Sequence, residues 1–93
     1  MLILPTAWAT DFRSAPPEGL ASVLQEILGR LRHRLQDPPV NVWFHCAPAG
    51  TWAGTFHWHV HVVPRLTVEG GWELGAGMPI NVMAPEQAAE FLR

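Results

Sequence analysis

Hydrophobic and polar residues alternate through 56–63, which reads Phe-His-Trp-His-Val-His-Val-Val. Successive side chains of an extended chain point to opposite faces, so this alternation predicts a β-strand. One face of that strand would be apolar and buried, and the other would carry a row of imidazoles. The apolar residues are Phe56, Trp58, Val60 and Val62, and the imidazoles belong to His57, His59 and His61.

Between Glu18 and Asp37 the hydrophobic residues follow the period of a helix and do not alternate. Apolar residues recur there at steps of three and four, which predicts an amphipathic helix with one apolar stripe. Pro17 and Glu18 suit its first turn, and Asp37-Pro38-Pro39 ends it, because proline cannot continue a helix. The stripe consists of Leu20, Val23, Leu24, Ile27, Leu28, Leu31 and Leu35.

Shorter patterns predict the other strands and a last helix. The run 2–4 reads as a strand stopped by Pro5, and 40–45 alternates as a second strand. A third strand-like piece covers 79–83, and a short C-terminal helix opens at Pro85 and covers 86–93. Since the chain begins in a strand and stops inside a helix, we expect half of a larger unit or one subunit of a tight assembly.

Glycine and proline mark the connections. The turn-rich stretch 46–54 joins strand 40–45 directly to the histidine strand, which is most simply explained by an antiparallel pair. That pairing would bring His45, at the end of one strand, towards His57, at the start of the other. A second turn is expected at Gly70-Gly71.

The composition sets the broad class of the protein. Ninety-three residues, 48% of them hydrophobic, suit a single domain over 1–93. A net charge of −2, with arginine as the only strongly basic residue type, excludes a broad nucleic-acid-binding surface. The one cysteine allows no internal disulfide, and no signal peptide or membrane-spanning run is present, so we expect a cytoplasmic protein without a membrane partner.

The row of histidines is the main candidate for chemistry. Imidazole serves as nucleophile, acid, base or metal ligand, so three rings on one face indicate chemistry on phosphate or a metal site. The plain alternative is an edge strand with solvated rings. Arg65 is the best-placed cation for a phosphate oxygen, with an ordinary surface arginine as its alternative. Cys46 could be a ligand or a nucleophile, and a small buried residue is the better interpretation.

The spacing His-x-His-x-His within 57–63 resembles the signature of the histidine triad superfamily. The resemblance implies that the middle imidazole attacks the α-phosphate of a nucleotide and forms a covalent nucleotidyl-histidine. A free-standing homodimeric nucleotide hydrolase would then use His59 as nucleophile, flanked by His57 and His61. The Gly-Gln-Ser lead-in typical of the small hydrolases is absent, and Trp52-Ala53-Gly54-Thr55 stands in its place.

Four further segments look like the C-terminal half of galactose-1-phosphate uridylyltransferase, namely 43–48, 64–67, 71–77 and 85–93. That family is built from two histidine-triad-like halves and exchanges uridylyl groups between UDP-glucose and galactose 1-phosphate. The resemblance implies an α+β fold, with a histidine-triad-like antiparallel sheet, one long helix and a short C-terminal helix.

The resemblance also implies roles for the histidines. The family's nucleophile lies in a His-Pro-His segment of the N-terminal half, which does not occur here. By motif, His45, His57 and His59 would bind zinc or iron together with a carboxylate of the other half, and His61 has the least defined role. A UDP-sugar or other nucleotide and a hexose 1-phosphate would be the substrates, bound by a homodimer or by association with an N-terminal half. A third reading is a non-catalytic, metal-stabilised domain that docks on a partner through exposed tryptophans.

Overall fold

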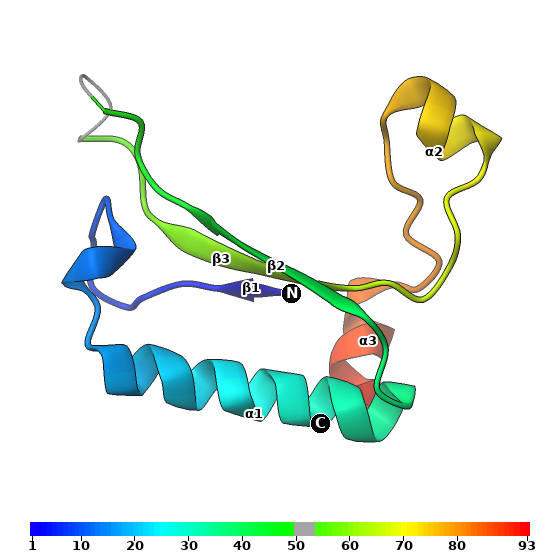
Figure 1. The fold of residues 1–93 in the computed structure, drawn as a ribbon, viewed down its shortest axis with the longest axis horizontal. Coiled ribbons are helices and arrows are strands. Elements are labelled where there is room, and N and C mark those ends of the chain that lie inside the picture. The colour runs from blue at the N-terminus through cyan, green and yellow to red at the C-terminus, as the bar shows by residue number, and fades with distance from the viewer. Residues whose placement is uncertain (50–53) are drawn as a thin grey trace.

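The computed structural model describes residues 1–49 and 54–93, and it has the predicted α+β class. Helix α1 runs beneath the sheet, α3 lies at the C-terminal end of α1, and α2 stands away from the sheet (Figure 1). The elements in chain order are β1 (Leu2–Ile3), the 3-10 helix η1 (Phe12–Ser14), α1 (Pro17–Leu35), β2 (Val40–His45), β3 (His59–Pro64), α2 (Gly71–Ala76) and α3 (Pro85–Phe91).

The histidine strand β3 lies in the middle of a three-stranded antiparallel sheet of order β1-β3-β2. The predicted antiparallel pairing of 40–45 with the histidine strand is therefore confirmed. Its register differs from the prediction, because His45 lies opposite His59 and not near His57. This shift by two residues decides which histidines meet.

Strand β3 begins at His59, three residues later than the predicted strand over 56–63. The residues before it are held by the N-terminal segment. The Trp58 N–H donates to the carbonyl oxygen of Ala9 at 2.9 Å, and the Ala9 N–H donates to Nδ1 of His57 at 3.3 Å. The register would place Ala47 opposite His57, but the Ala47 N–H donates to the carbonyl oxygen of Thr10 at 2.9 Å, so His57 lies outside the ladder.

The core lies between β3 and α1. Trp58, Val60 and Val62 are exposed by 2% or less and pack with Leu31 of α1, which confirms the predicted apolar face of the histidine strand. Further apolar residues pack around this cluster, among them Ile3, Leu20, Leu24, Ile27, Leu35 and Phe56. Two residues of the predicted helical stripe, Val23 and Leu28, remain 41% and 39% exposed.

The last turns of α1 also hold the end of the chain. Gln36, at the C-terminus of α1, adopts a left-handed conformation with φ of 61°, and its N–H closes the helix on the carbonyl oxygen of Arg32. The Arg34 guanidinium donates to the carbonyl oxygen of Arg93 at 2.7 Å, and Arg30 reaches that of Leu92 at 3.4 Å. These bonds place α3 beside α1.

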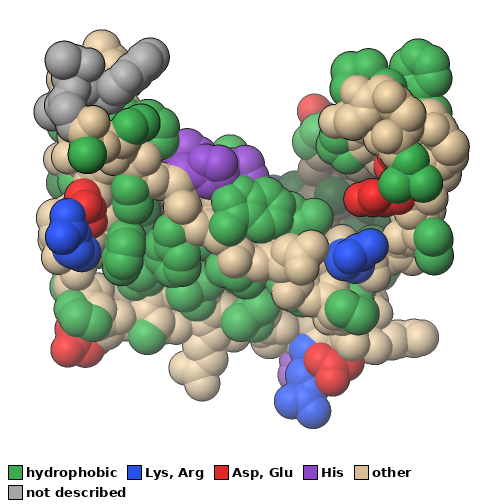
Figure 2. Space-filling view, turned by 45° about the horizontal axis from the view of Figure 1, so that its top comes forward, with side chains coloured by type: hydrophobic (Ala, Val, Ile, Leu, Met, Phe, Trp, Pro, Cys, Tyr) green, Lys and Arg blue, Asp and Glu red, His purple; other side chains and the backbone are tan. Residues whose placement is uncertain are grey.

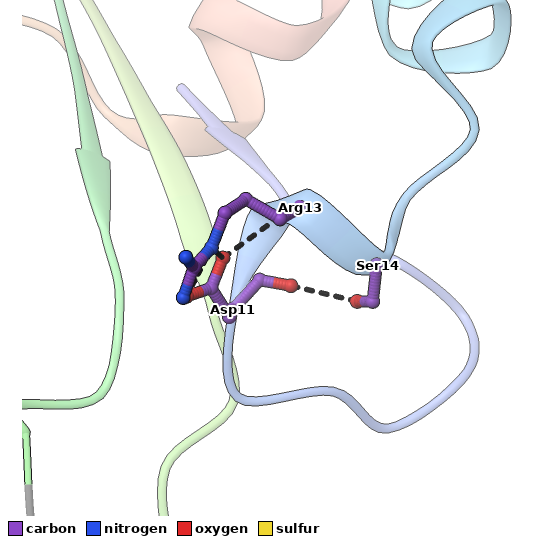
Figure 3. Close-up of polar contacts among 3 residues, drawn as sticks. All are labelled: Asp11, Arg13 and Ser14. Carbon is purple, nitrogen blue, oxygen red and sulfur yellow. Dashed lines mark hydrogen bonds and ion pairs between the residues drawn. The ribbon is translucent and has the colours of Figure 1, made fainter.

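The turn at η1 is organised by Asp11 (Figure 3). Its carboxylate accepts the Arg13 N–H at 2.9 Å and forms an ion pair with the Arg13 guanidinium at 2.6 Å, which lowers the pKa of Asp11. The Ser14 hydroxyl donates to the carbonyl oxygen of Asp11 at 2.7 Å. The turn aims Phe12 at Phe44 of β2, with ring centroids 5.0 Å apart.

The segment after β3 forms an arm, residues 65–84, which carries α2. The strand-like piece predicted at 79–83 is wrong, since these residues belong to no strand. The Glu73 carboxylate explains this, because it accepts the Gly70 N–H at 2.8 Å and the Ile80 N–H at 2.9 Å. The first bond caps α2 and the second folds the following segment back onto it, and both lower the pKa of Glu73. Within the described ranges no helix has the length and apolar character needed to span a membrane.

Candidate metal centre

Three histidines from two strands gather on the face of the sheet opposite α1. His45 ends β2, His59 begins β3 directly across from it, and His61 follows two positions later. Each offers one ring nitrogen, and these three nitrogens lie within 4.8 Å of one another. Ring centroids are 4.8 Å apart for His45 and His59, 4.6 Å for His45 and His61, and 5.1 Å for His59 and His61.

The ladder itself produces this cluster. Side chains alternate between the two faces of a strand, so Val60, between the two histidines, and Val62, after the second, enter the core and keep β3 in place on α1. The histidine side chains lie at the floor of a hollow between the end of the molecule that holds η1 and the end that holds α2 (Figure 2). A substrate or another polypeptide can therefore reach the cluster from the open side of the sheet.

Neighbouring aromatic side chains stack on two of the imidazoles and limit their rotation. Trp43 of β2 lies opposite His61 in the ladder, and their rings stack with centroids 5.2 Å and planes 8° apart. Phe56 stacks on His59 at 5.8 Å. These contacts limit rotation of the rings, which is how a binding site keeps its ligands in place before an ion arrives.

The hydrogen bonds of the cluster define which nitrogens are free. Nδ1 of His59 lies 3.0 Å from the carbonyl oxygen of His57, so it carries the proton and donates, which leaves a lone pair on Nε2. Nε2 of His45 is buried and has no hydrogen-bond partner among the described residues. A buried nitrogen without a partner is costly, and a bound cation would satisfy it.

The electrostatics of the site favour the neutral form of His61. Burial lowers the pKa of His61, and the neighbouring His45 and His59 lower it further. Imidazole binds metals in its neutral form, so this environment favours the ligand state of His61. Three imidazoles whose nitrogens lie this close together are a donor set that zinc and iron both accept, so the residues present fit the metal that the sequence resemblance implies.

His57 does not belong to this cluster. Its Nε2–H donates to the carbonyl oxygen of Pro5 at 2.9 Å, its Nδ1 accepts the Ala9 N–H, and its ring stacks on Trp8 with centroids 4.9 Å apart. Both ring nitrogens are thus engaged by the N-terminal segment. The structure does not bring together the expected ligand set of His45, His57 and His59, and it places His61 where His57 was expected.

The remaining candidates lie outside the cluster. Arg65 follows the end of β3, four residues beyond His61, which corresponds to about 13 Å along an extended chain. Its side chain is exposed. Cys46 is half-buried and packs against the core cluster, as expected for a small buried residue. Trp52 and Ala53, which stand where the small hydrolases have their lead-in, lie outside the described residues.

Sequence reasoning gave His61 no definite role and did not consider Trp43 as part of the site. The signal for both was the register of the β2–β3 pair. Counting back from His45 opposite His59 places Trp43 opposite His61. The connecting stretch 46–54 set no such register, because a loop of that length allows several.

Comparisons with known proteins agree with this fold. No family model matches the chain. An ADP-glucose phosphorylase from Arabidopsis thaliana is 34% identical over 77 residues, which is 80% of this chain and 22% of that protein. The chain thus spans about a fifth of the length of this curated relative.

Two solved structures are similar over nearly the whole chain. The first is an ADP-glucose phosphorylase from Arabidopsis thaliana with bound ADP-glucose, at 28% identity and a TM-score of 0.88. The second is a GalT-like protein from the same plant, at 31% identity and a TM-score of 0.90. Each alignment covers 99% of this chain. It covers 32% of the first solved structure and 33% of the second.

Proposed function

Since this chain is a galactose-1-phosphate uridylyltransferase-like protein with the histidine triad fold, we propose that it supplies the metal-binding part of a nucleotidyl-transfer site. The observation that carries the proposal is the cluster of His45, His59 and His61 at the ends of two paired strands. The His-Pro-His segment of the family is absent from this chain, so its nucleophile would come from another polypeptide or another part of a longer one.

The metal would be zinc or iron, held by His45, His59 and His61. When bound, the ion would supply positive charge to the site, and its three ligands would tie β2 to β3. The hydrogen bond from His59 to the carbonyl oxygen of His57 orients that imidazole for the ion, and stacking on Trp43 does the same for His61. Three protein ligands would leave a coordination position open, which suits a carboxylate from the polypeptide that supplies the nucleophile.

The substrates would be a nucleotide sugar and a phosphate-bearing acceptor. The sequence resemblance favours UDP-glucose with galactose 1-phosphate. The relatives favour ADP-glucose, which one of them holds in its solved structure. Both are nucleoside diphosphate sugars, and in either case the transferred nucleotidyl group is the nucleoside together with its α-phosphate.

Calorimetric titration tests this function on the purified chain. We expect binding of zinc and, in the zinc-loaded protein, binding of ADP-glucose or UDP-glucose. The His61→Ala variant should lose both, and the matched control His33→Ala, an exposed histidine on α1, should keep both. A wild-type chain that binds neither metal nor nucleotide sugar would contradict the proposal. A transfer assay with galactose 1-phosphate or inorganic phosphate then shows whether the chain acts alone.

One observation favours a second function, that of a nucleotide hydrolase with His59 as nucleophile. Its Nδ1–H is tied to a carbonyl oxygen, so the lone pair of Nε2 is directed towards the cluster. That nitrogen would bond to the α-phosphorus as the bond from phosphorus to the leaving group breaks, and the leaving oxygen or, in a phosphoramidate, the leaving nitrogen takes up a proton. Water would then cleave the phosphorus–nitrogen bond and release the nucleotide. His61 would be the flanking histidine, since both nitrogens of His57 are engaged elsewhere.

The two functions respond to zinc in opposite directions, because ion and phosphorus would compete for Nε2 of His59. Under the hydrolase alternative, mass spectrometry after incubation with a nucleoside phosphoramidate should show an added nucleotidyl group on the wild-type chain and none on His59→Ala. Added zinc should inhibit formation of this adduct. Under the transferase proposal, zinc promotes nucleotide-sugar binding.

Exposed tryptophans favour the third, non-catalytic reading. Trp8, Trp43 and Trp72 are 59%, 40% and 65% exposed. A metal-stabilised partner domain would gain thermal stability with zinc and bind no nucleotide sugar, so the same titration separates it from the other two.

A further inference from the structure

Trp8 is a large apolar side chain that the fold holds in a fixed place and still leaves exposed. It is 59% exposed, although the backbone beside it is bonded on two sides. The carbonyl oxygen of Ala9 accepts the Trp58 N–H at 2.9 Å, and that of Thr10 accepts the Ala47 N–H at 2.9 Å. Since little of this tryptophan is buried, it contributes little to the core, and its fixed exposure indicates a role in binding.

His57 supports the Trp8 ring from one side. The two rings stack with centroids 4.9 Å and planes 20° apart. The imidazole is itself held in place, because one of its nitrogens bonds to Pro5 at 2.9 Å and the other to Ala9 at 3.3 Å. With one face of the indole covered by this imidazole, the exposed area belongs to the opposite face and the edges. The pair therefore presents a preorganised aromatic surface on which a flat ring can stack.

This surface lies at the end of the ladder that carries two histidines of the metal cluster. The segment that holds Trp8 bonds to the backbone one residue before His59 and two residues beyond His45. His57, beneath the indole, precedes His59 by two residues, which corresponds to about 7 Å along an extended chain. The loop between β1 and η1 lies at this same end of the sheet (Figure 1), which bounds the hollow above the histidines (Figure 2).

A nucleobase is the kind of flat ring that such a surface accepts. Stacking of a base on an aromatic side chain tolerates any base, because every base has a π-face and stacking reads no hydrogen-bonding edge. In a nucleotide the ribose separates the base from the α-phosphate. A base on Trp8 therefore leaves the phosphates free to lie towards the histidine cluster.

We propose that Trp8 is the stacking residue for the nucleobase of the nucleotide sugar, and that it makes the site prefer ADP-glucose to UDP-glucose. The fused rings of adenine overlap an indole over a larger area than the single ring of uracil, so adenine stacks more strongly. Both nucleotide sugars bind, and the adenine compound binds more tightly. The inference rests on the proposed function, because it needs a nucleotide sugar beside the histidine cluster.

Calorimetric titration of the zinc-loaded chain tests the inference. Trp8→Ala should weaken binding of ADP-glucose by roughly 5- to 150-fold, as expected for the loss of one stacked base. ADP, which carries the base without the hexose, should lose as much. Zinc affinity should stay unchanged, because Trp8 offers the ion no ligand. Phe91→Ala is the matched control, since Phe91 is a 46% exposed aromatic residue on α3, and it should bind ADP-glucose like the wild type.

The outcomes separate this inference from the function on which it rests. Equal affinity of Trp8→Ala and the wild type for ADP-glucose overturns the role of Trp8 and leaves the proposed function standing, whereas a wild-type chain that binds no nucleotide sugar overturns both. Weaker binding of ADP-glucose together with unchanged binding of ADP would place the hexose on the indole, which also contradicts the inference. UDP-glucose bound as tightly as ADP-glucose by the wild type contradicts the preference for adenine.

Two further measurements apply if Trp8→Ala fails to fold. Trp8→Phe keeps an aromatic ring on His57, so it should retain zinc affinity and bind ADP-glucose less tightly than the wild type. In NMR spectra of the zinc-loaded wild type saturated with ADP-glucose, nuclear Overhauser effects should connect the adenine ring protons with those of the Trp8 indole. A saturated complex without these effects overturns the inference.

Discussion

His45 of β2 lies directly opposite His59 of β3, and their rings stack with centroids 4.8 Å and planes 8° apart. This relationship fixes the composition of the site. With His45 opposite His59, the next histidine on the same face within reach is His61, while His57 falls beyond the start of the ladder. His59 and His61 thus belong to the metal site, whereas His57, from the same row of histidines, holds the N-terminal segment.

We predict that His57→Ala destabilises the fold. One ring nitrogen of His57 bonds to Pro5 and the other to Ala9, and the ring stacks on Trp8, so removal of the side chain frees the N-terminal segment. Two lost hydrogen bonds at a partly buried site should reduce the free energy of unfolding by about 1–3 kcal/mol. Urea denaturation measures the change. His33→Ala should stay within about 0.5 kcal/mol of the wild type, and equal effects of the two substitutions would contradict this role of His57.

We predict a larger loss for Leu31→Ala. Leu31 is 1% exposed and is the one residue of α1 that is fully buried against Trp58, Val60 and Val62. Truncation leaves a cavity in this small core and should cost about 2–5 kcal/mol in the free energy of unfolding. Leu74→Ala is the matched control, because Leu74 is 69% exposed on α2. A Leu31→Ala variant as stable as Leu74→Ala would show that the core lies elsewhere.

We predict that the arm loosens in acid through Glu73. Hydrogen bonds from Ile80 and Gly70 hold the pKa of the Glu73 carboxyl below its ordinary value of 4.5. A depressed carboxyl pKa in the folded state stabilises the fold above the unfolded value, and this contribution is lost as the pH falls through the folded value. NMR spectra should show the Gly70 and Ile80 amide signals moving together below pH 4.5, at the pKa of Glu73.

The Glu73→Gln variant supplies the control for that titration. Glutamine keeps an acceptor oxygen and has no charge, so both amide signals should become independent of pH in the acidic range. Movement of the two signals in Glu73→Gln with the wild-type midpoint would assign the transition to another group.

The local patterns of the sequence were sufficient for much of the fold. Alternation in 56–63 predicted the buried face of Trp58, Val60 and Val62, and a turn-rich link predicted the antiparallel pair. These features depend on side-chain periodicity, which a sequence shows directly. The helical content of 71–76 was missed, because its glycines suggested a turn and its cap depends on Glu73 reaching back to Gly70.

The site was harder to predict because it depends on register and on distant partners. The alternation placed His57, His59 and His61 on one face with equal weight. What separates His57 from the other two is a contact with Pro5 and Ala9, about fifty residues earlier, and no local pattern indicates it. Pairing of His45 with His59 then selects His61 for the cluster.

Zinc affinity of four histidine variants tests the central claim most directly. By competition with a chromophoric chelator, we expect the wild type to bind one zinc ion per chain. His45→Ala and His61→Ala should each weaken binding by more than the roughly 10–100-fold typical of losing an outer-shell partner. His57→Ala, whose backbone carbonyl still accepts from His59, should bind like the wild type and the His33→Ala control. Loss of zinc in His57→Ala together with wild-type affinity in His61→Ala would contradict the assignment of the site to His45, His59 and His61.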